Sequence, residues 1–525
     1  MTIKNKSSYR KSILLFLLAA FFLAGFGWWH SNDFIIGHTL RNLLGKPKGL
    51  GSVKPPSFKV VGTTKPTFTP AELMNFRKSF ENREFASLVT TASAIHNALE
   101  GDLANEYKYF DFYDFFEAGI PEHEALFDEW VNYSPRHYAP YLARAHYYYA
   151  MGWQARGDKF ASETDAQNFG EMFRYFQLCR QDIEKALSFN SRLITAYSML
   201  LGIANASDAE EEENRLIDKG SSLFPDSFLL YYTMLWTKLP RWGGSFEEMN
   251  GIARRAYDHV KKNQEIHLLF GSIYTNMAMD LRKAKKFNEA LALTAKALEY
   301  GDHYSFYEEQ ARILIDMNEY ASALDDINKA ISLRPNAPSP YLGRAMIYAA
   351  TDRLEETIAD LDYIEARFPQ HTMLESTRKW CAGKFLLRGS EAGKSDSFAA
   401  IAYFDKALMI QECDGRAYHM KGHAYAMMMD FNNAISALEK AAQCGYRDIM
   451  AFKMLDYCLA YQQRWDDILQ WWAVYLAWDP ENGEAYLERA GTYKHKGDSQ
   501  SALADLKRAC DLGQRKACTL QQQYR

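Results

Sequence analysis

Two histidines and two tryptophan-containing clusters are the residues whose type and spacing could support chemistry in this chain of 525 residues. His419 and His423 are four residues apart, so a helix would place both imidazoles on one face at the spacing of metal ligands. No carboxylate or third histidine follows one turn later, and we expect no metal site. The chain also lacks the glycine-rich nucleotide motifs, the nucleophile elbow and the zinc-protease motif, so no cofactor is expected.

The two tryptophan clusters allow a structural or a ligand-binding interpretation. In the first cluster, which contains Trp153, Arg156 could bind a carboxylate or phosphate through paired hydrogen bonds, or it could tie a helix end to a neighbour. In the second cluster we expect Trp242 to fill a joint between helices and Ser245 to cap the next helix together with Glu248. A ligand-binding cleft that both clusters line is the alternative.

Both clusters resemble segments of a bacterial family that is defined only as a domain of unknown function. Its members carry a W-x-A-R-G segment and a later W-G-G-S segment, which residues 153–157 and 242–245 match here. The resemblance spans about residues 71–262. It implies no particular activity.

The composition excludes several classes of protein. Hydrophobic residues make up 48% of the chain and charged residues 24%, which is typical of globular proteins and excludes disorder throughout. With only 15 prolines and 30 glycines, the chain does not fit a collagen-like or turn-dense all-β architecture. The net charge of −5 gives no global attraction to nucleic acid, and we expect no nucleic-acid partner.

The first thirty residues have the pattern of a membrane anchor. Four basic residues precede an uncharged apolar run from Ile13 to Trp29, which just reaches the length that crosses ~30 Å of hydrocarbon. The positive flank predicts a cytoplasmic N-terminus and an extracytoplasmic bulk, periplasmic if the protein is bacterial. We therefore predict an anchor over 1–30 and a linker over 31–70. A cleaved signal, which would make the protein secreted, and a buried soluble helix are the alternatives.

Aromatic residues recur with a period of 34 in the C-terminal half. Tyr307, Tyr341, Tyr418, Phe452 and Tyr486 follow this period, with one longer interval of 77 residues. The same small and large apolar residues return behind each aromatic, which predicts one helical hairpin per unit. The pattern resembles the tetratricopeptide repeat over about residues 271–525. The resemblance implies an all-α fold, a right-handed α-solenoid of helix-turn-helix repeats with a concave surface.

The sequence also predicts units outside the regular period. The 77-residue interval should hold one unit with helices over Met373–Leu387 and Phe398–Met409, joined by a long surface loop over Gly389–Ser397. Residues 71–262 should form a helical domain with degenerate repeats, because Tyr141, Ala145 and Tyr148 match the first-helix pattern. The regular array is then expected over 263–525.

The last unit resembles the Sel1-like relatives of the repeat. That resemblance implies a disulfide between Cys510 and Cys518, and two small core thiols are the alternative. Seven cysteines leave at least one thiol unpaired, and we predict no pairing for the other five.

The family's concave-face positions select the candidate binding residues. They are Arg312, Met346, His419, His423, Lys453, Tyr457, Tyr461 and Lys494, and the same positions also select Glu308, Asp316, Leu342, Met427, Leu487 and His495. The C-terminal members are aromatic and basic, which suits an extended peptide or its carboxylate. The alternative is that some of them coat a solvated face.

These observations predict a non-enzymatic, membrane-anchored scaffold that binds a protein or peptide in a concave groove. The alternative is a cell-envelope enzyme or carbohydrate-binding protein that uses the Trp153–Arg156 and Trp242–Ser245 clusters. The oligomeric state is not predicted.

Overall fold

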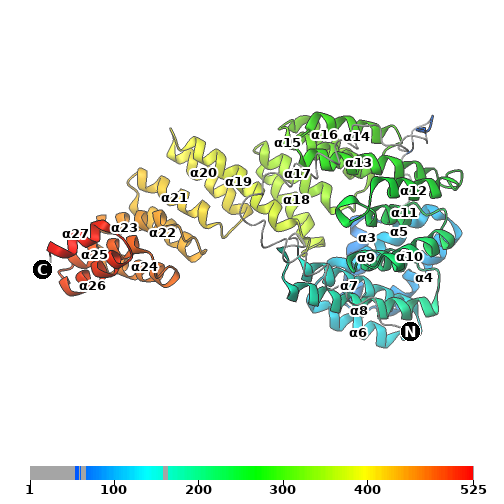
Figure 1. The fold of residues 1–525 in the computed structure, drawn as a ribbon, viewed down its shortest axis with the longest axis horizontal. Coiled ribbons are helices and arrows are strands. Elements are labelled where there is room, and N and C mark those ends of the chain that lie inside the picture. The colour runs from blue at the N-terminus through cyan, green and yellow to red at the C-terminus, as the bar shows by residue number, and fades with distance from the viewer. Residues whose placement is uncertain (1–53, 58–59, 61–66, 158–162, 524–525) are drawn as a thin grey trace, which may run out of the picture. The chain divides into compact units, whose positions relative to one another are not determined.

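The computed structural model describes residues 54–57, 60, 67–157 and 163–523. Within these ranges the regular elements are helices, labelled α3 to α27 in Figure 1, which confirms the predicted all-α class for this part of the chain. No helix in these ranges is long and apolar enough to cross a membrane. The predicted anchor over 1–30 and most of the linker over 31–70 lie outside the described residues.

The helices form two compact units, and both draw on residues from either side of the predicted boundary near residue 262. The first unit includes Ile95–Tyr109 and Asn190–Ile313. Its complete helices are α9 (Ile194–Ala206), α10 (Glu210–Leu223), α11 (Phe228–Thr237), α12 (Phe246–Tyr257), α13 (His267–Lys283) and α14 (Phe287–Leu298). Each of these helices packs against the next one in the chain, and α11 also packs against α9 and α13.

The second unit combines Thr67–Ala94, Phe110–Phe189 and Leu314–Arg525. Its N-terminal helices are α3 (Pro70–Glu81), α6 (Glu124–Tyr133), α7 (Tyr138–Arg156) and α8 (Ala166–Phe189). Three helices have residues in both units: α4 (Phe85–Gly101), α5 (Glu106–Asp114) and α15 (Tyr304–Asp316). Helix α3 begins where Thr69 and Glu72 form a capping box, the helix start that Thr69, Pro70 and Glu72 indicate in the sequence.

The rest of the second unit is an array of helical pairs, and Figure 1 shows α19 to α27 following one another pair by pair. The first helices are α17 (Pro338–Ala350), α19 (Leu374–Ala392), α21 (Gly415–Met427), α23 (Ile449–Tyr461) and α25 (Gly483–His495). The second helices are α18 (Leu354–Arg367), α20 (Ser397–Ile410), α22 (Phe431–Gln443), α24 (Trp465–Trp478) and α26 (Ser499–Asp511). Helix α16 (Tyr320–Leu333) precedes this array and α27 (Arg515–Gln523) follows it.

Two recurring contacts show why the 34-residue pattern folds into hairpins. The hydroxyl of the leading tyrosine donates to the carbonyl six residues earlier, as in Tyr341 to Pro335 at 3.1 Å, and thereby fixes the turn before the helix. An arginine one turn later reaches the second helix, as in Arg344 to Asp360 at 2.8 Å. The same two contacts occur in α7, from Tyr141 to Pro135 and from Arg144 to Asp182, and again in α25, from Tyr486 to Pro480 and from Arg489 to Asp505.

The turn inside most of the hairpins uses one residue in the left-handed region, whereas the turn between α19 and α20 has none. Non-glycine residues take this conformation at Arg83, Asp208, Lys285, Asn318, Asp352, Met429 and Gln463, and Gly497 takes it in the last repeat. For an L-residue this conformation costs about 1–2 kcal/mol. Because the same turn joins α3 to α4 and α9 to α10, the N-terminal helices share the hairpin geometry of the C-terminal ones.

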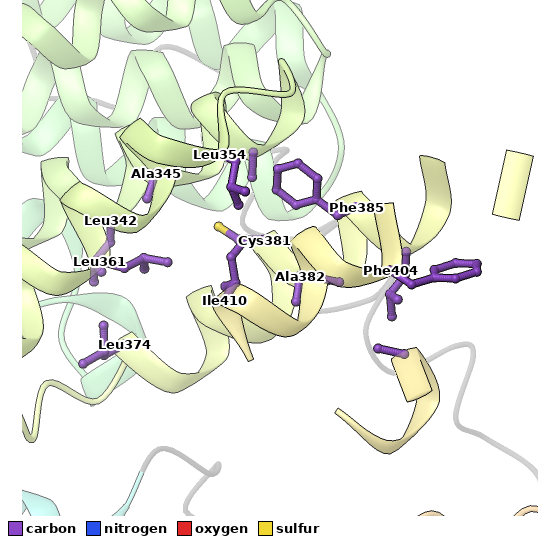
Figure 2. Close-up of a cluster of buried hydrophobic side chains, with 14 of the residues drawn as sticks. Leu342, Ala345, Leu354, Leu361, Leu374, Cys381, Ala382, Phe385, Phe404 and Ile410 are labelled. Atoms are coloured by element: carbon purple, nitrogen blue, oxygen red, sulfur yellow. The ribbon is translucent and has the colours of Figure 1, made fainter. Parts of the chain in front are cut away.

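The unit in the 77-residue interval corrects one expectation. Residues 389–392, predicted as loop, continue helix α19, and only residues 393–396 separate it from α20. Helix α20 packs closely against Gly389, since a Cβ atom at this position would lie 2.4 Å from the Phe404 ring. Glycine is therefore the residue that lets α19 continue past this contact. Figure 2 shows the buried cluster to which this contact belongs, with Phe385 of α19 near Leu354 of α18 and Phe404 on α20 farther along the same core. The insertion therefore lengthens a helix and not the surface loop.

Two disulfides lie in the C-terminal repeats. Cys510 and Cys518 are bonded across the turn from α26 to α27. Cys413 and Cys444 are also bonded, a pair that the sequence analysis did not propose, and their bond joins the start of α21 to the end of α22. Cys179, Cys381 and Cys458 are buried free thiols.

Candidate functional site: an exposed methionine–tyrosine surface

Four large apolar side chains are exposed on α21, α23 and the turn after α21. Tyr457 and Tyr461 lie one turn apart on α23 and are 58% and 60% exposed. Met427 ends α21, Met429 lies in the following turn, and both are about two-thirds exposed. We call these four residues the methionine–tyrosine surface.

A buried phenylalanine ties this surface to the repeat framework. The ring of Phe431, the first residue of α22, lies 4.2 Å from the ring of Tyr461 and 6.1 Å from that of Tyr457. Phe431 is almost fully buried, so it holds the two tyrosine rings without closing their outer faces. Tyrosine offers a large rigid contact area at little cost in side-chain entropy, and the flexible methionines can adapt to the shape of a partner, as in protein-binding surfaces.

Lys453 lies one turn before Tyr457 but does not make this region basic. Its Nζ lies 2.7 Å from Glu484 Oε1 and 3.1 Å from Glu488 Oε1, both on α25, and these bonds raise the pKa of Lys453. The two carboxylates outnumber the one ammonium group, so these three side chains together carry a net negative charge. The expectation of a basic surface that captures a carboxylate is wrong at this position, because the next repeat supplies the counter-charges.

Asp456 adds a further acid beneath the same face of α23. Its Oδ2 accepts a hydrogen bond of 2.6 Å from Trp472 Nε1 on α24. Burial raises the pKa of Asp456 to about 6 despite this bond. The negative charge beside the methionine–tyrosine surface therefore depends on pH in the range just below neutrality.

The remaining predicted groove residues fall into different environments. The ring of His419 packs on Tyr446 at 5.3 Å, and burial lowers its pKa, whereas His423 is exposed. In the described part of the chain these two histidines belong to no cluster of three metal-ligating groups. Met346 packs partly buried against the core of α17 to α20, and Lys494 is exposed at the end of α25.

Two predicted groove positions contribute to the framework. Leu342 is 1% exposed and belongs to the core, so its expected place on the concave face is wrong. Arg312 forms an ion pair with Glu308 on its own helix at 2.8 Å. Arg312 belongs to the first unit.

The first tryptophan cluster forms part of a helix end. Trp153 is half-buried, and its ring meets that of Phe176 at 5.4 Å. Arg156 is the last residue of α7 and donates a hydrogen bond to the carbonyl of Gly157 at 3.1 Å, and it pairs with no carboxylate among the described residues. Gln154 and Gly157 line a pocket of about 340 Å³ together with residues 369–372 and the start of α19.

The second cluster is a capped corner in the first unit. Ser245 Oγ accepts from the Glu248 amide at 3.2 Å and donates to the Glu248 carboxylate, so Ser245 caps α12 (Phe246–Tyr257) together with Glu248, although the carboxylate bonds the hydroxyl of Ser245 and not its amide as in a full capping box. Gly243 takes φ 91°, the left-handed conformation at the end of a short 3₁₀ turn. Trp242 is 42% exposed, so the expectation that it fills a joint is wrong.

One group of titratable residues has no counterpart in the sequence analysis. Asp114, Glu117 and His146 each place a possible ligand atom within 4.8 Å of the others. The sequence shows that Asp114 and Glu117 are three residues apart, which places them on one side of a continuous helical path. It does not show that His146 joins them, because His146 comes from a different helix.

Comparison with known proteins agrees with the repeat geometry. Residues 304–337 and 415–443 match the family model of the tetratricopeptide repeat. The comparison with curated proteins finds no match. The Sel1-like unit and the resemblance to a family of unknown function stay predictions.

Several solved structures are similar to this chain. One is YrrB, described as a TPR protein with an unusual peptide-binding site, at 21% identity, covering 44% of this chain and 97% of YrrB, with a TM-score of 0.22. Another is the C-terminal part of a TPR repeat-containing protein from Cytophaga hutchinsonii, at 18% identity, covering 47% of this chain and 98% of the other, with a TM-score of 0.29. A third is a tetratricopeptide repeat protein from Parabacteroides merdae, at 16% identity, covering 59% of this chain and 97% of the other, with a TM-score of 0.24.

The chain thus contains tetratricopeptide repeats in an all-helical fold. Repeats of this kind are generally non-enzymatic and mediate interactions between proteins through extended surfaces.

Proposed function

We propose that this protein is a membrane-anchored scaffold that binds a protein or peptide partner on its repeat helices. The observation that carries the proposal is the methionine–tyrosine surface of Met427, Met429, Tyr457 and Tyr461. Four large apolar side chains exposed on adjacent repeats are costly in water unless a partner covers them. Aromatic anchors of this kind carry much of the binding energy in protein interfaces.

The charges beside this surface indicate the chemistry of the partner. Lys453 is paired twice, by Glu484 and Glu488, and Asp456 lies beneath the same helix face. A partner segment with apolar side chains flanked by lysine or arginine would complement this arrangement, whereas an acidic segment or a free carboxylate would be repelled.

A photo-crosslinking residue at position 457 of the full chain tests this function in intact cells. We expect crosslinks to a protein partner from position 457, and none to that partner from the matched position Met409, which is 65% exposed on α20. Tyr461→Ala should weaken the crosslink at least tenfold. Equal crosslinking from both positions, or unchanged crosslinking in Tyr461→Ala, would count against a specific binding surface.

Membrane attachment and an extracytoplasmic location belong to the same proposal. The apolar run from Ile13 to Trp29 behind basic residues supports an anchor, and the two disulfides suit an oxidising compartment. Cell fractionation with determination of the mature N-terminus tests it. A mature chain that begins near Trp28 and is recovered in the soluble fraction would refute the anchor.

A carbohydrate-binding role in the cell envelope is the second candidate, and one observation favours it. Trp236 and Trp242 are 38% and 42% exposed, and the Arg241 guanidinium lies 4.8 Å from the centre of the Trp236 ring. Exposed tryptophan faces can stack on sugar rings. Binding of the full chain to purified cell-wall polysaccharide that is lost in Trp242→Ala would favour this function, and no binding would reject it.

A further inference from the structure

We propose that Asp114, Glu117 and His146 bind a divalent transition-metal ion, with Zn²⁺ as the best fit to the donor set. The three side chains offer one imidazole nitrogen and two carboxylate oxygens, and these atoms lie within 4.8 Å of one another. Donors around tetrahedral zinc at ~2.1 Å are separated by about 3.4 Å, so a small movement of the side chains completes the site. Imidazole with carboxylate suits Zn²⁺ better than Mg²⁺, which prefers oxygen donors alone.

The backbone brings these donors together from two elements of the second unit. Asp114 is the last residue of α5, and Glu117 lies in the 3₁₀ turn η2 (Phe115–Ala118) that continues it. His146 lies in the middle of α7, which packs directly against η2. The ring of Tyr113 stacks on the imidazole at 5.4 Å between centres and restricts its orientation. A shared metal ion would join the end of α5 to α7.

Two of the three groups have unused capacity for binding. His146 is 2% exposed, and its Nδ1 points at Glu117 Oε1 at 2.8 Å. Its Nε2 is buried with no hydrogen-bond partner among the described residues. The Asp114 side chain makes no hydrogen bond or ion pair within the described part of the chain. A bound cation would engage the Asp114 carboxylate and one of the two ring nitrogens of His146.

The neighbouring groups and the solvent access of the site are compatible with a bound cation. The neighbouring Asp111 is already engaged by Arg334 and Asn336. The Glu117 side chain keeps 34% of its surface exposed, which gives an ion access from solvent.

Metal binding to the full-length protein after treatment with a chelator tests the site. Isothermal titration with ZnCl₂, and separately with MnCl₂ and MgCl₂, should show one site that prefers Zn²⁺. The nearly isosteric double variant Asp114→Asn/Glu117→Gln should bind Zn²⁺ at least a hundredfold more weakly. Glu81→Gln is the matched control, because Glu81 and His123 lie 3.7 Å apart as an isolated pair, and it should bind like the wild type.

A second measurement places the bound ion and does not require the variant to fold. Hydrogen exchange of the wild-type chain should slow on Zn²⁺ addition in peptides from residues 106–118 and 138–156, but not in those from 415–443. Equal Zn²⁺ affinity of the wild type and the double variant, no Zn²⁺ binding at all, or protection confined to residues 415–443 would overturn the proposal.

Discussion

Removal of the disulfide between Cys413 and Cys444 should destabilise its repeat more than removal of the bond between Cys510 and Cys518. A disulfide stabilises mainly by restricting the unfolded chain, and the effect grows with the loop that it closes. The first bond joins residues 31 apart and the second joins residues 8 apart. The loop-entropy relation gives about 3.7 kcal/mol for the first and about 2.5 kcal/mol for the second.

The assay must resolve individual repeats, because a helical array does not unfold as one cooperative unit. Hydrogen exchange of the full chain reads the opening of each hairpin separately. In Cys413→Ser/Cys444→Ser, the most protected amides of α21 and α22 should exchange roughly 500-fold faster than in the wild type. In Cys510→Ser/Cys518→Ser, those of α26 and α27 should exchange roughly 70-fold faster.

Substitution by serine removes little else, because none of the four cysteines is fully buried. Wild-type protein in the presence of a reductant is the control and should reproduce both effects. A loss that is equal at both sites, or larger for the shorter loop, would falsify the loop-entropy reasoning. No change at all would mean that the bonds do not form in the native protein.

Four further substitutions test the packing of the repeats by the same exchange measurement. Gly389→Ala should destabilise its helical pair by about 1–3 kcal/mol, because the added Cβ atom would meet the Phe404 ring. Gly383→Ala, on the same helix but in open space, should instead stabilise the pair by about 0.5–1 kcal/mol. Met429→Gly should stabilise its turn by about 1 kcal/mol by relieving a left-handed conformation, and an unchanged or lower stability would contradict this. Because burial raises the pKa of Asp456 from 3.8 to about 6, the fold should lose stability as the pH rises between these two values, and the full loss is present above pH 6. Asp456→Asn should therefore stabilise α23 and α24 by about 1–2 kcal/mol at pH 7.5 and by little at pH 4, and the same effect at both pH values would refute this.

Hairpin boundaries in the regular repeats could be predicted because local patterns decide them. Each leading aromatic, such as Tyr341 in α17, lies on the fourth residue of its first helix, where the period of 34 places it. The exception at residues 389–392 has a clear cause. Residues 389–391 are Gly, Ser and Glu, a series that usually indicates a loop. They are helical here because Gly389 has no side chain and therefore leaves room for the Phe404 ring of the neighbouring helix.

The candidate sites could be predicted only in part, because they depend on contacts between helices. The sequence determined that Tyr457 and Tyr461 share a helix face, since this follows from helix geometry alone. Only the tertiary structure decided that Leu342 is buried, that Glu484 and Glu488 neutralise Lys453, and that Cys413 meets Cys444. It also brought His146 to Asp114 and Glu117. Periodicity along a chain records which face of a helix a residue occupies, whereas the packing of one helix against another selects the side chains that meet there.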